Sequence, residues 1–182
     1  MSANSLDNTL NTAAADIDPI MEMLDVFNDG VDTFNADAAL LMHGRRFKHI
    51  DRRPAGLRQG PLGQCFKNCT SPLMQFLSDP HPPYLYAEGY ALDTELGVPF
   101  QHAWLVDTAG RAIDLTWSDP ADAVYFGVTF SQEFLLEAMR LTEVYGVLFN
   151  PGLEKRLFAD QATFARTLRR PSLPGLPRST YT

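Results

Sequence analysis

Cysteine, long apolar runs and positive charge are scarce in this sequence. The scarcity of cysteine and of long apolar runs indicates the cellular compartment. The only cysteines are Cys65 and Cys69, four residues apart. They do not form the disulfide framework of a small secreted domain, and we expect no native disulfide between them. The first ten residues are polar, and no run of 18 apolar residues occurs. The sequence therefore predicts no signal peptide, no membrane partner and a reducing compartment, which we take to be the cytoplasm.

The shortage of positive charge argues against a nucleic-acid partner. The chain has 15 Lys and Arg residues against 22 Asp and Glu residues, which gives a net charge of −7. Binding to phosphates requires clustered Lys and Arg. The two basic clusters, at residues 45–53 and 166–170, are too short to outweigh an acidic chain.

The remaining composition is that of a globular protein. Of the 182 residues, 45% are hydrophobic and 20% are charged, which are ordinary values. A chain of this length can bury a full core without a metal or a disulfide. We expect a disordered leader over residues 1–14, a single domain over 15–168 and a flexible proline-rich tail over 169–182.

Hydrophobic periodicity changes from helical to alternating near residue 84. Before that point the pattern predicts helices over 15–28 and 36–42, a loop over 44–62 with one short strand at 47–50, and a helix from Cys65 to about residue 77. Pro72 removes a backbone hydrogen bond, so this last helix is either kinked there or begins late, near Thr70.

The second half of the chain predicts a sheet. Its elements are strands over 84–92, 99–107, 111–117 and 124–130, a fifth candidate strand over 145–149, and helices over 132–142 and 153–168. Gly89 marks either a bulge or a close approach of backbones. Helices followed by a meander of strands predict an α+β fold in which N-terminal helices pack on one antiparallel β-sheet.

Three residues carry chemistry in this scaffold. Cys65 stands at the start of a predicted helix, where a thiolate is favoured. His102 lies within one strand, and Asp114 lies on the next. In a simple hairpin residue 114 lies opposite residue 104, so Asp114 is a diagonal neighbour of His102 on the same face. Taken alone, such a cysteine or histidine is more often structural, but the three together indicate a thiol nucleophile with its base and its orienting carboxylate.

The motifs around these residues resemble a known family. They are Gly63-Gln64-Cys65, Tyr86-Ala87-Glu88-Gly89-Tyr90, His102-Ala103-Trp104 and Asp114-Leu115-Thr116-Trp117. In order and spacing they are similar to the transglutaminase-like branch of the papain-like cysteine hydrolases, over about residues 59–117.

The resemblance implies a papain/transglutaminase-like core with Cys65 as nucleophile, His102 as general base and acid, and Asp114 as the residue that orients His102. It also implies Gln59 as an oxyanion donor beside the backbone N–H of Cys65. The implied activity is acyl transfer without a cofactor or metal, with hydrolysis of an amide (peptide or isopeptide) or ester bond expected on a protein or peptide substrate. The sequence carries no signal for an oligomeric state.

Other interpretations stay open. The same scaffold can serve as a non-catalytic binding protein, or as an effector or inhibitor encoded by a phage or mobile element. A zinc site made of both cysteines and two histidines would match no structural spacing. We expect Cys69 in the core, Glu88 in solvent, and His43, His49 and His81 exposed.

Overall fold

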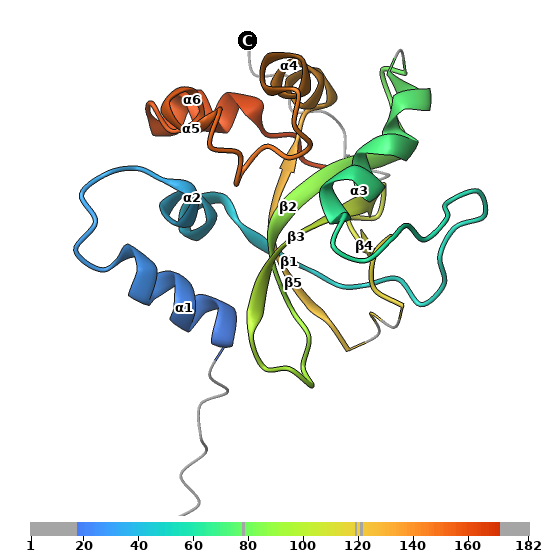
Figure 1. The fold of residues 1–182 in the computed structure, drawn as a ribbon, viewed down its shortest axis with the longest axis horizontal. Helices are drawn as coiled ribbons and strands as arrows, with labels where there is room; N and C mark the ends of the chain where they lie inside the picture. Colours follow the sequence, from blue (N-terminus) through green and yellow to red (C-terminus); the bar gives the residue numbers. More distant parts are fainter. Residues whose placement is uncertain (1–17, 78, 119, 121, 172–182) are drawn as a thin grey trace, which may run out of the picture.

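The computed structural model describes residues 18–77, 79–118, 120 and 122–171. These residues form a mixed fold of six α-helices, one short 3₁₀ helix and a single curled antiparallel sheet of five strands (Figure 1). The predicted α+β class is confirmed at this level. The predicted leader lies outside the described residues, and so does the predicted tail from residue 172 onward. Among the residues described, no helix has the length and apolar character needed to cross a membrane.

The strand order in the sheet is β1-β5-β2-β3-β4, and every neighbouring pair is antiparallel. The predicted meander holds for β2, β3 and β4, whereas β5 returns to the other edge of β2 and makes β2 the central strand. The strands are β1 (Arg45–Phe47), β2 (Tyr84–Leu92), β3 (Pro99–Asp107), β4 (Ala112–Ile113) and β5 (Val124–Phe130).

Two strands differ from the sequence prediction. β1 begins two residues before the predicted 47–50 segment and overlaps it only at Phe47. β4 has two residues instead of the predicted 111–117, because the Asp114 side chain takes over the next backbone donors. Its Oδ1 accepts hydrogen bonds from the backbone N–H groups of Thr116 and Trp117, at 2.6 and 3.0 Å. Residues 114–117 therefore turn away from β3 and leave the outer edge of β3 near His102 without a partner strand.

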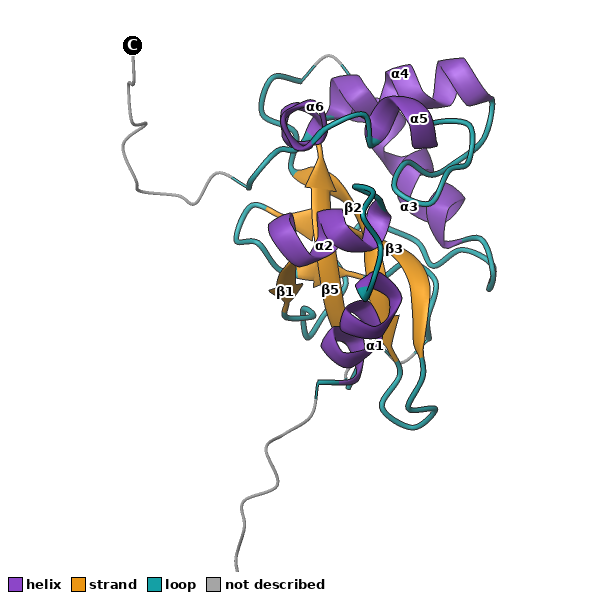
Figure 2. Ribbon diagram, turned by 90° about the vertical axis from the view of Figure 1, so that its left-hand side faces the viewer, coloured by secondary structure: helices purple, strands orange, loops and turns teal. Residues whose placement is uncertain are grey.

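The helices before the sheet begin at polar caps. Asp18 caps α1 (Pro19–Asn28) and Asn35 caps α2 (Ala36–His43), each through a side-chain oxygen that accepts a backbone N–H. The described part of the predicted first helix thus begins at Pro19, a residue type suited to the first helical position. α1 and α2 lie against one face of the sheet (Figure 2).

The third helix settles the question that Pro72 raised. α3 (Cys65–Leu73) begins at Cys65, and the chain continues as the 3₁₀ helix η1 (Met74–Phe76) directly after the proline turn. The proline is too near the helix end to disturb the first turn. The N-terminus of α3 is therefore intact where the candidate nucleophile stands.

Among the described residues after β5 the chain forms three helices, and the predicted strand over 145–149 is not formed. Ser131 caps α4 (Gln132–Thr142), which has the predicted bounds. The predicted helix over 153–168 is divided into α5 (Glu154–Leu157) and α6 (Gln161–Thr167), because Asp160 caps a new helix within it. Residues 145–149 form a loop, since the Glu88 carboxylate occupies the N–H groups of Val147 and Leu148 that a strand would need.

The two faces of the sheet bury different clusters. The larger core lies between the sheet and the helices, and includes Cys65, Cys69 and Leu105. The smaller one, on the opposite face, centres on Trp104, whose ring covers Gly127 so closely that a Cβ there would lie 2.6 Å from it. Pairing through Gly89 is continuous, so this glycine marks a close approach rather than a bulge.

Candidate active site

The candidate nucleophile lies at the first residue of α3. Cys65 is buried, with 8% of its surface exposed, and its backbone N–H belongs to the first turn, where no helical carbonyl can accept it. The preceding Gly63 has φ +73°, a left-handed conformation that a side chain would strain. The sequence Gly63-Gln64-Cys65 thus turns the chain sharply into the helix.

His102 and Asp114 form a buried pair beside this helix. His102 Nε2 lies 2.8 Å from Asp114 Oδ2, and both side chains are almost completely buried. The register Leu105 to Ile113 puts residue 114 opposite residue 104, which is the hairpin arrangement that the sequence predicted. Because Nε2 faces Asp114, Nδ1 is the ring nitrogen left to meet Cys65, which lines the same cavity as His102.

The electrostatics of the pair favour a charged imidazole. Burial by itself lowers the pKa of His102, but the hydrogen bonds with Asp114 and Cys65 and the charges of both raise that pKa to about 9. Burial raises the pKa of Asp114, and the hydrogen bond and charge of His102 outweigh this and lower it. At neutral pH the folded protein therefore has a charged His102 imidazolium beside the Asp114 carboxylate.

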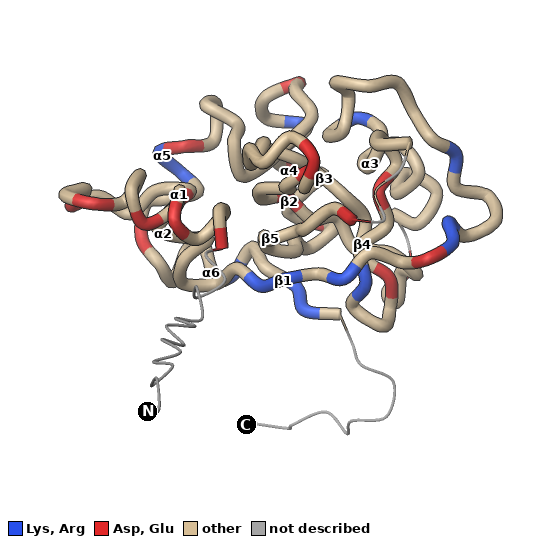
Figure 3. Tube along the Cα trace, turned by 90° about the horizontal axis from the view of Figure 1, so that it is seen from below, with Lys and Arg blue, Asp and Glu red and all other residues tan. Residues whose placement is uncertain are grey.

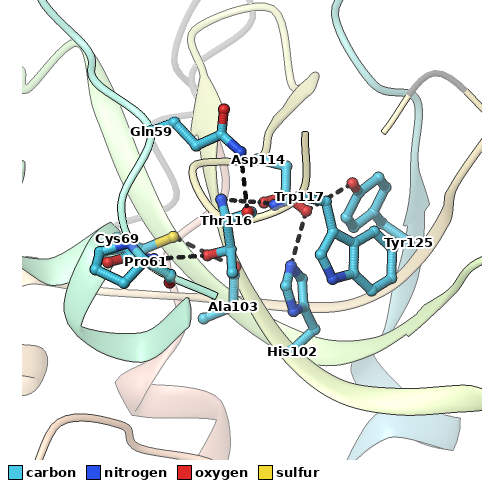
Figure 4. A network of polar contacts seen from close by, with 10 residues as sticks. Gln59, Pro61, Cys69, His102, Ala103, Asp114, Thr116, Trp117 and Tyr125 are labelled. Carbon is cyan, nitrogen blue, oxygen red and sulfur yellow. Dashed lines mark hydrogen bonds and ion pairs between the residues drawn. The ribbon is translucent and has the colours of Figure 1, made fainter. Parts of the chain in front are cut away.

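Two aromatic residues hold this pair, and sequence reasoning did not assign either of them to it. Tyr125, on β5, donates its hydroxyl hydrogen to Asp114 Oδ2 at 2.8 Å. Trp117 stacks on the His102 ring with centroids 4.6 Å apart and an angle of 27° (Figure 4). The signal available for Trp117 was its place in the aspartate motif, whereas Tyr125 lies on a strand that no motif covers.

Cys65 and His102 open into one cavity of about 410 Å³. Its walls come from the first turn of α3, the start of β3, the β2–β3 hairpin and the segment after β4. The lining residues are Gly63, Cys65, Phe66, Asp93, Leu96, Phe100, Gln101, His102, Thr116 and Trp117. A ligand in this cavity can reach the thiol and the imidazole together.

Gln59 lies near the site but outside this cavity lining. Its Nε2 donates to the carbonyl oxygen of Thr116 at 3.2 Å. The polar contacts between α3 and the cavity wall come instead from Asn68, whose Nδ2 donates to Pro61 O and to Thr116 Oγ1. Asn68 thereby holds the loop before α3 and the segment after β4 against the helix.

Cys69 is one turn further along α3 and has a different environment. It is fully buried, and its Sγ donates to the carbonyl oxygen of Ala103 at 3.3 Å. Burial raises the pKa of the Cys69 thiol well above its ordinary value. The structure thus puts Cys69 in the core, as expected, and not in the cavity.

Three other polar residues are less exposed than predicted. Glu88 is fully buried, because its carboxylate accepts the N–H groups of Val147 at 2.5 Å and Leu148 at 2.8 Å. Burial, opposed in part by these hydrogen bonds, raises the pKa of Glu88 to about 7. His43 and His49 are half-buried because they pack on Phe164 and Tyr125, whereas His81 is exposed as expected. Within the described ranges, no three His, Cys, Asp or Glu side chains are placed to hold a metal ion.

Comparison with known proteins finds no match to a protein-family model, to a curated protein or to a solved structure. The function of this chain is therefore inferred from its own geometry.

Proposed function

We propose that the protein is a cysteine-dependent acyl-transfer enzyme with a transglutaminase-like, papain-type core, and that it hydrolyses an amide (peptide or isopeptide) or ester bond. The observation that supports this most is that Cys65 of α3 and His102 of β3 line one cavity, while Asp114, directly after β4, holds the His102 ring from behind. A histidine with only a structural role needs a hydrogen-bond partner, but it does not need to share a cavity with a thiol at a helix N-terminus.

In the reactive form His102 already carries the proton as an imidazolium and Cys65 is the thiolate. The Sγ thiolate then attacks the substrate carbonyl carbon, and the carbonyl electron pair moves onto the oxygen. As this tetrahedral species collapses, the bond to the leaving nitrogen or oxygen breaks, and His102 gives its proton to that atom. A thioester on Cys65 remains. Water attacks it, His102 takes a water proton and returns it to the departing thiolate, and the acid leaves.

The remaining residues position these groups. Asp114 fixes the ring orientation of His102 and offsets its charge. The unpaired backbone N–H of Cys65 is the proposed donor to the oxyanion. Gln59 joins it only after giving up its hydrogen bond to the Thr116 carbonyl, a net loss of about 1 kcal/mol for a typical hydrogen bond.

An ester burst tests the proposed function. A nitrophenyl acetate substrate should release close to one equivalent of nitrophenol in a fast phase and leave an acetyl group on Cys65, which mass spectrometry locates. Cys65→Ser should abolish the burst, and Cys69→Ser, the matched control on the same helix, should keep it. Acylation that is absent, or that falls on another residue, would leave the non-catalytic binding protein as the better account.

A further inference from the structure

A second cavity adjoins the one at Cys65. It has a volume of about 340 Å³, and the two share Asp93 and Trp117 as lining residues. The groove therefore continues from the thiol past the Trp117 ring, between the β2–β3 hairpin and the segment after β4. Cavities of this size are typical of ligand sites.

The charged residues of this groove, apart from His102, are acidic. Asp93, Glu95 and Asp122 line its second part, and no Lys or Arg of the described ranges lines either part. None of these three carboxylates has an ion-pair partner among the residues the structure describes. Two of the other cavities have Lys or Arg in their walls, whereas the cavity between α2 and α5 has Asp37 and Glu154 instead. Lys48 and Arg53 line the one beside β1, where Lys and Arg gather in Figure 3.

The same groove exposes large apolar side chains. Leu96 and Phe100 line the Cys65 cavity and are 63% and 44% exposed, and Leu62 lines the acidic part and is 74% exposed. Apolar residues exposed together around a cavity indicate contact with a ligand. The acidic and apolar walls together fit a ligand that has both a cationic group and an apolar group.

We propose that the substrate of Cys65 is a cationic peptide segment. It places an apolar side chain beside Leu96 and Phe100 and a Lys or Arg side chain against Asp93, Glu95 and Asp122. This inference rests on the proposed function and names its substrate class. Charge complementarity supports it, since a cation in this groove meets three carboxylates and no competing basic residue.

Matched electrophilic peptides test the charge preference. The probes are bromoacetyl-capped dipeptide amides with leucine first and lysine, glutamine or glutamate second. Alkylation forms the bond from Cys65 Sγ to carbon, releases bromide and leaves the thiol proton on His102 or solvent. In a Cys69→Ser background the lysine probe should react on the order of tenfold faster than the glutamate probe at low salt, and added salt should reduce this ratio.

A pair of variants separates the groove from the net charge of the chain. Glu95→Gln with Asp122→Asn should lower the ratio to about threefold or less, because the carboxylates nearest the cation are gone. Asp93 is left unchanged, since its Oδ1 caps the hairpin through the N–H groups of Glu95 and Leu96. The control is Asp25→Asn with Asp32→Asn, which removes the same charge from exposed positions on α1 and the loop after it. That variant should keep the ratio.

Equal rates for the lysine and glutamate probes would overturn the substrate proposal, and so would an equal loss of preference in the control variant. Iodoacetamide, which is small and neutral, distinguishes this failure from failure of the proposed function. If its rate at Cys65 still depends on His102, the catalytic pair stands and only the cationic substrate is wrong. If it does not, both fail.

Discussion

Asp114 is the residue on which the candidate site depends. Its two oxygens accept four hydrogen bonds, from the backbone N–H groups of Thr116 and Trp117, from Tyr125 and from His102. A buried carboxylate is stable only with such partners. The same contacts hold His102 in one orientation, so the residue that ends β4 also prepares the imidazole for Cys65.

Tyr125 should therefore act as a positioning residue. Tyr125→Phe removes one donor from Asp114 and should cost about 1 kcal/mol of unfolding free energy, measured by urea titration. It should also lower the rate of Cys65 alkylation at neutral pH, because His102 is held less firmly. Restoring a donor with Tyr125→His should recover part of the rate.

The control for this variant is Tyr90→Phe, since the Tyr90 hydroxyl donates to the Asp37 carboxylate away from the catalytic pair. It should cost similar stability and leave the alkylation rate unchanged. Equal effects of the two variants on the rate would mean that Tyr125 has only a structural role.

Among the elements, the loop between α4 and α5 depends on one side chain of β2. The Glu88 carboxylate accepts two backbone N–H groups of this loop, and a Cβ at the neighbouring Gly146 would lie 3.4 Å from the Phe66 ring, which lines the cavity. The loop therefore supports the back of the candidate site.

Glu88 should make stability depend on pH in a defined window. Its pKa is raised from 4.5 to about 7 on folding, so the folded protein binds the extra proton between these values. The contribution is present below about pH 4.5 and is lost as the pH rises through about 7. Urea titrations across this range should show that loss, and Glu88→Gln should remove it. A parent protein that gains stability in step with the variant would contradict the assignment.

The elements also show what sequence can and cannot predict. Periodicity located β2, β3, β5 and α4 to the residue, and spacing paired His102 with Asp114 across the correct hairpin register. The sequence pattern did not predict the places where a side chain accepts backbone N–H groups that a strand would use. Asp114 shortened β4 through a local turn, in which it accepts the N–H groups two and three residues later, and an alternating pattern does not register such a turn. Glu88 replaced the strand over 145–149 by a loop, and its partners lie 59 and 60 residues away, so the tertiary fold sets them. Tyr125 was missed for the same reason.

For the molecule as a whole, the buried pair of His102 and Asp114 links stability to pH in a second window. The pKa of His102 rises from 6.5 to about 9 on folding, so the folded state binds more protons between these values. This stability is present below about pH 6.5 and is lost as the pH rises through about 9, an effect of at most about 3 kcal/mol.

His102→Gln should remove the loss of stability between about pH 6.5 and 9 and keep the loss at lower pH that belongs to Glu88. Urea titrations of both proteins at each pH measure the difference. An unchanged upper window in the variant would show that another group titrates there.

The most direct test of the catalytic pair is the rate of Cys65 alkylation by iodoacetamide against pH, measured in a Cys69→Ser background with and without His102→Ala. The account predicts that at about pH 7 the His102→Ala variant reacts at least about tenfold more slowly than the parent. Superimposable profiles in the two proteins would contradict the pairing of Cys65 with His102, and with it the proposed acyl-transfer chemistry.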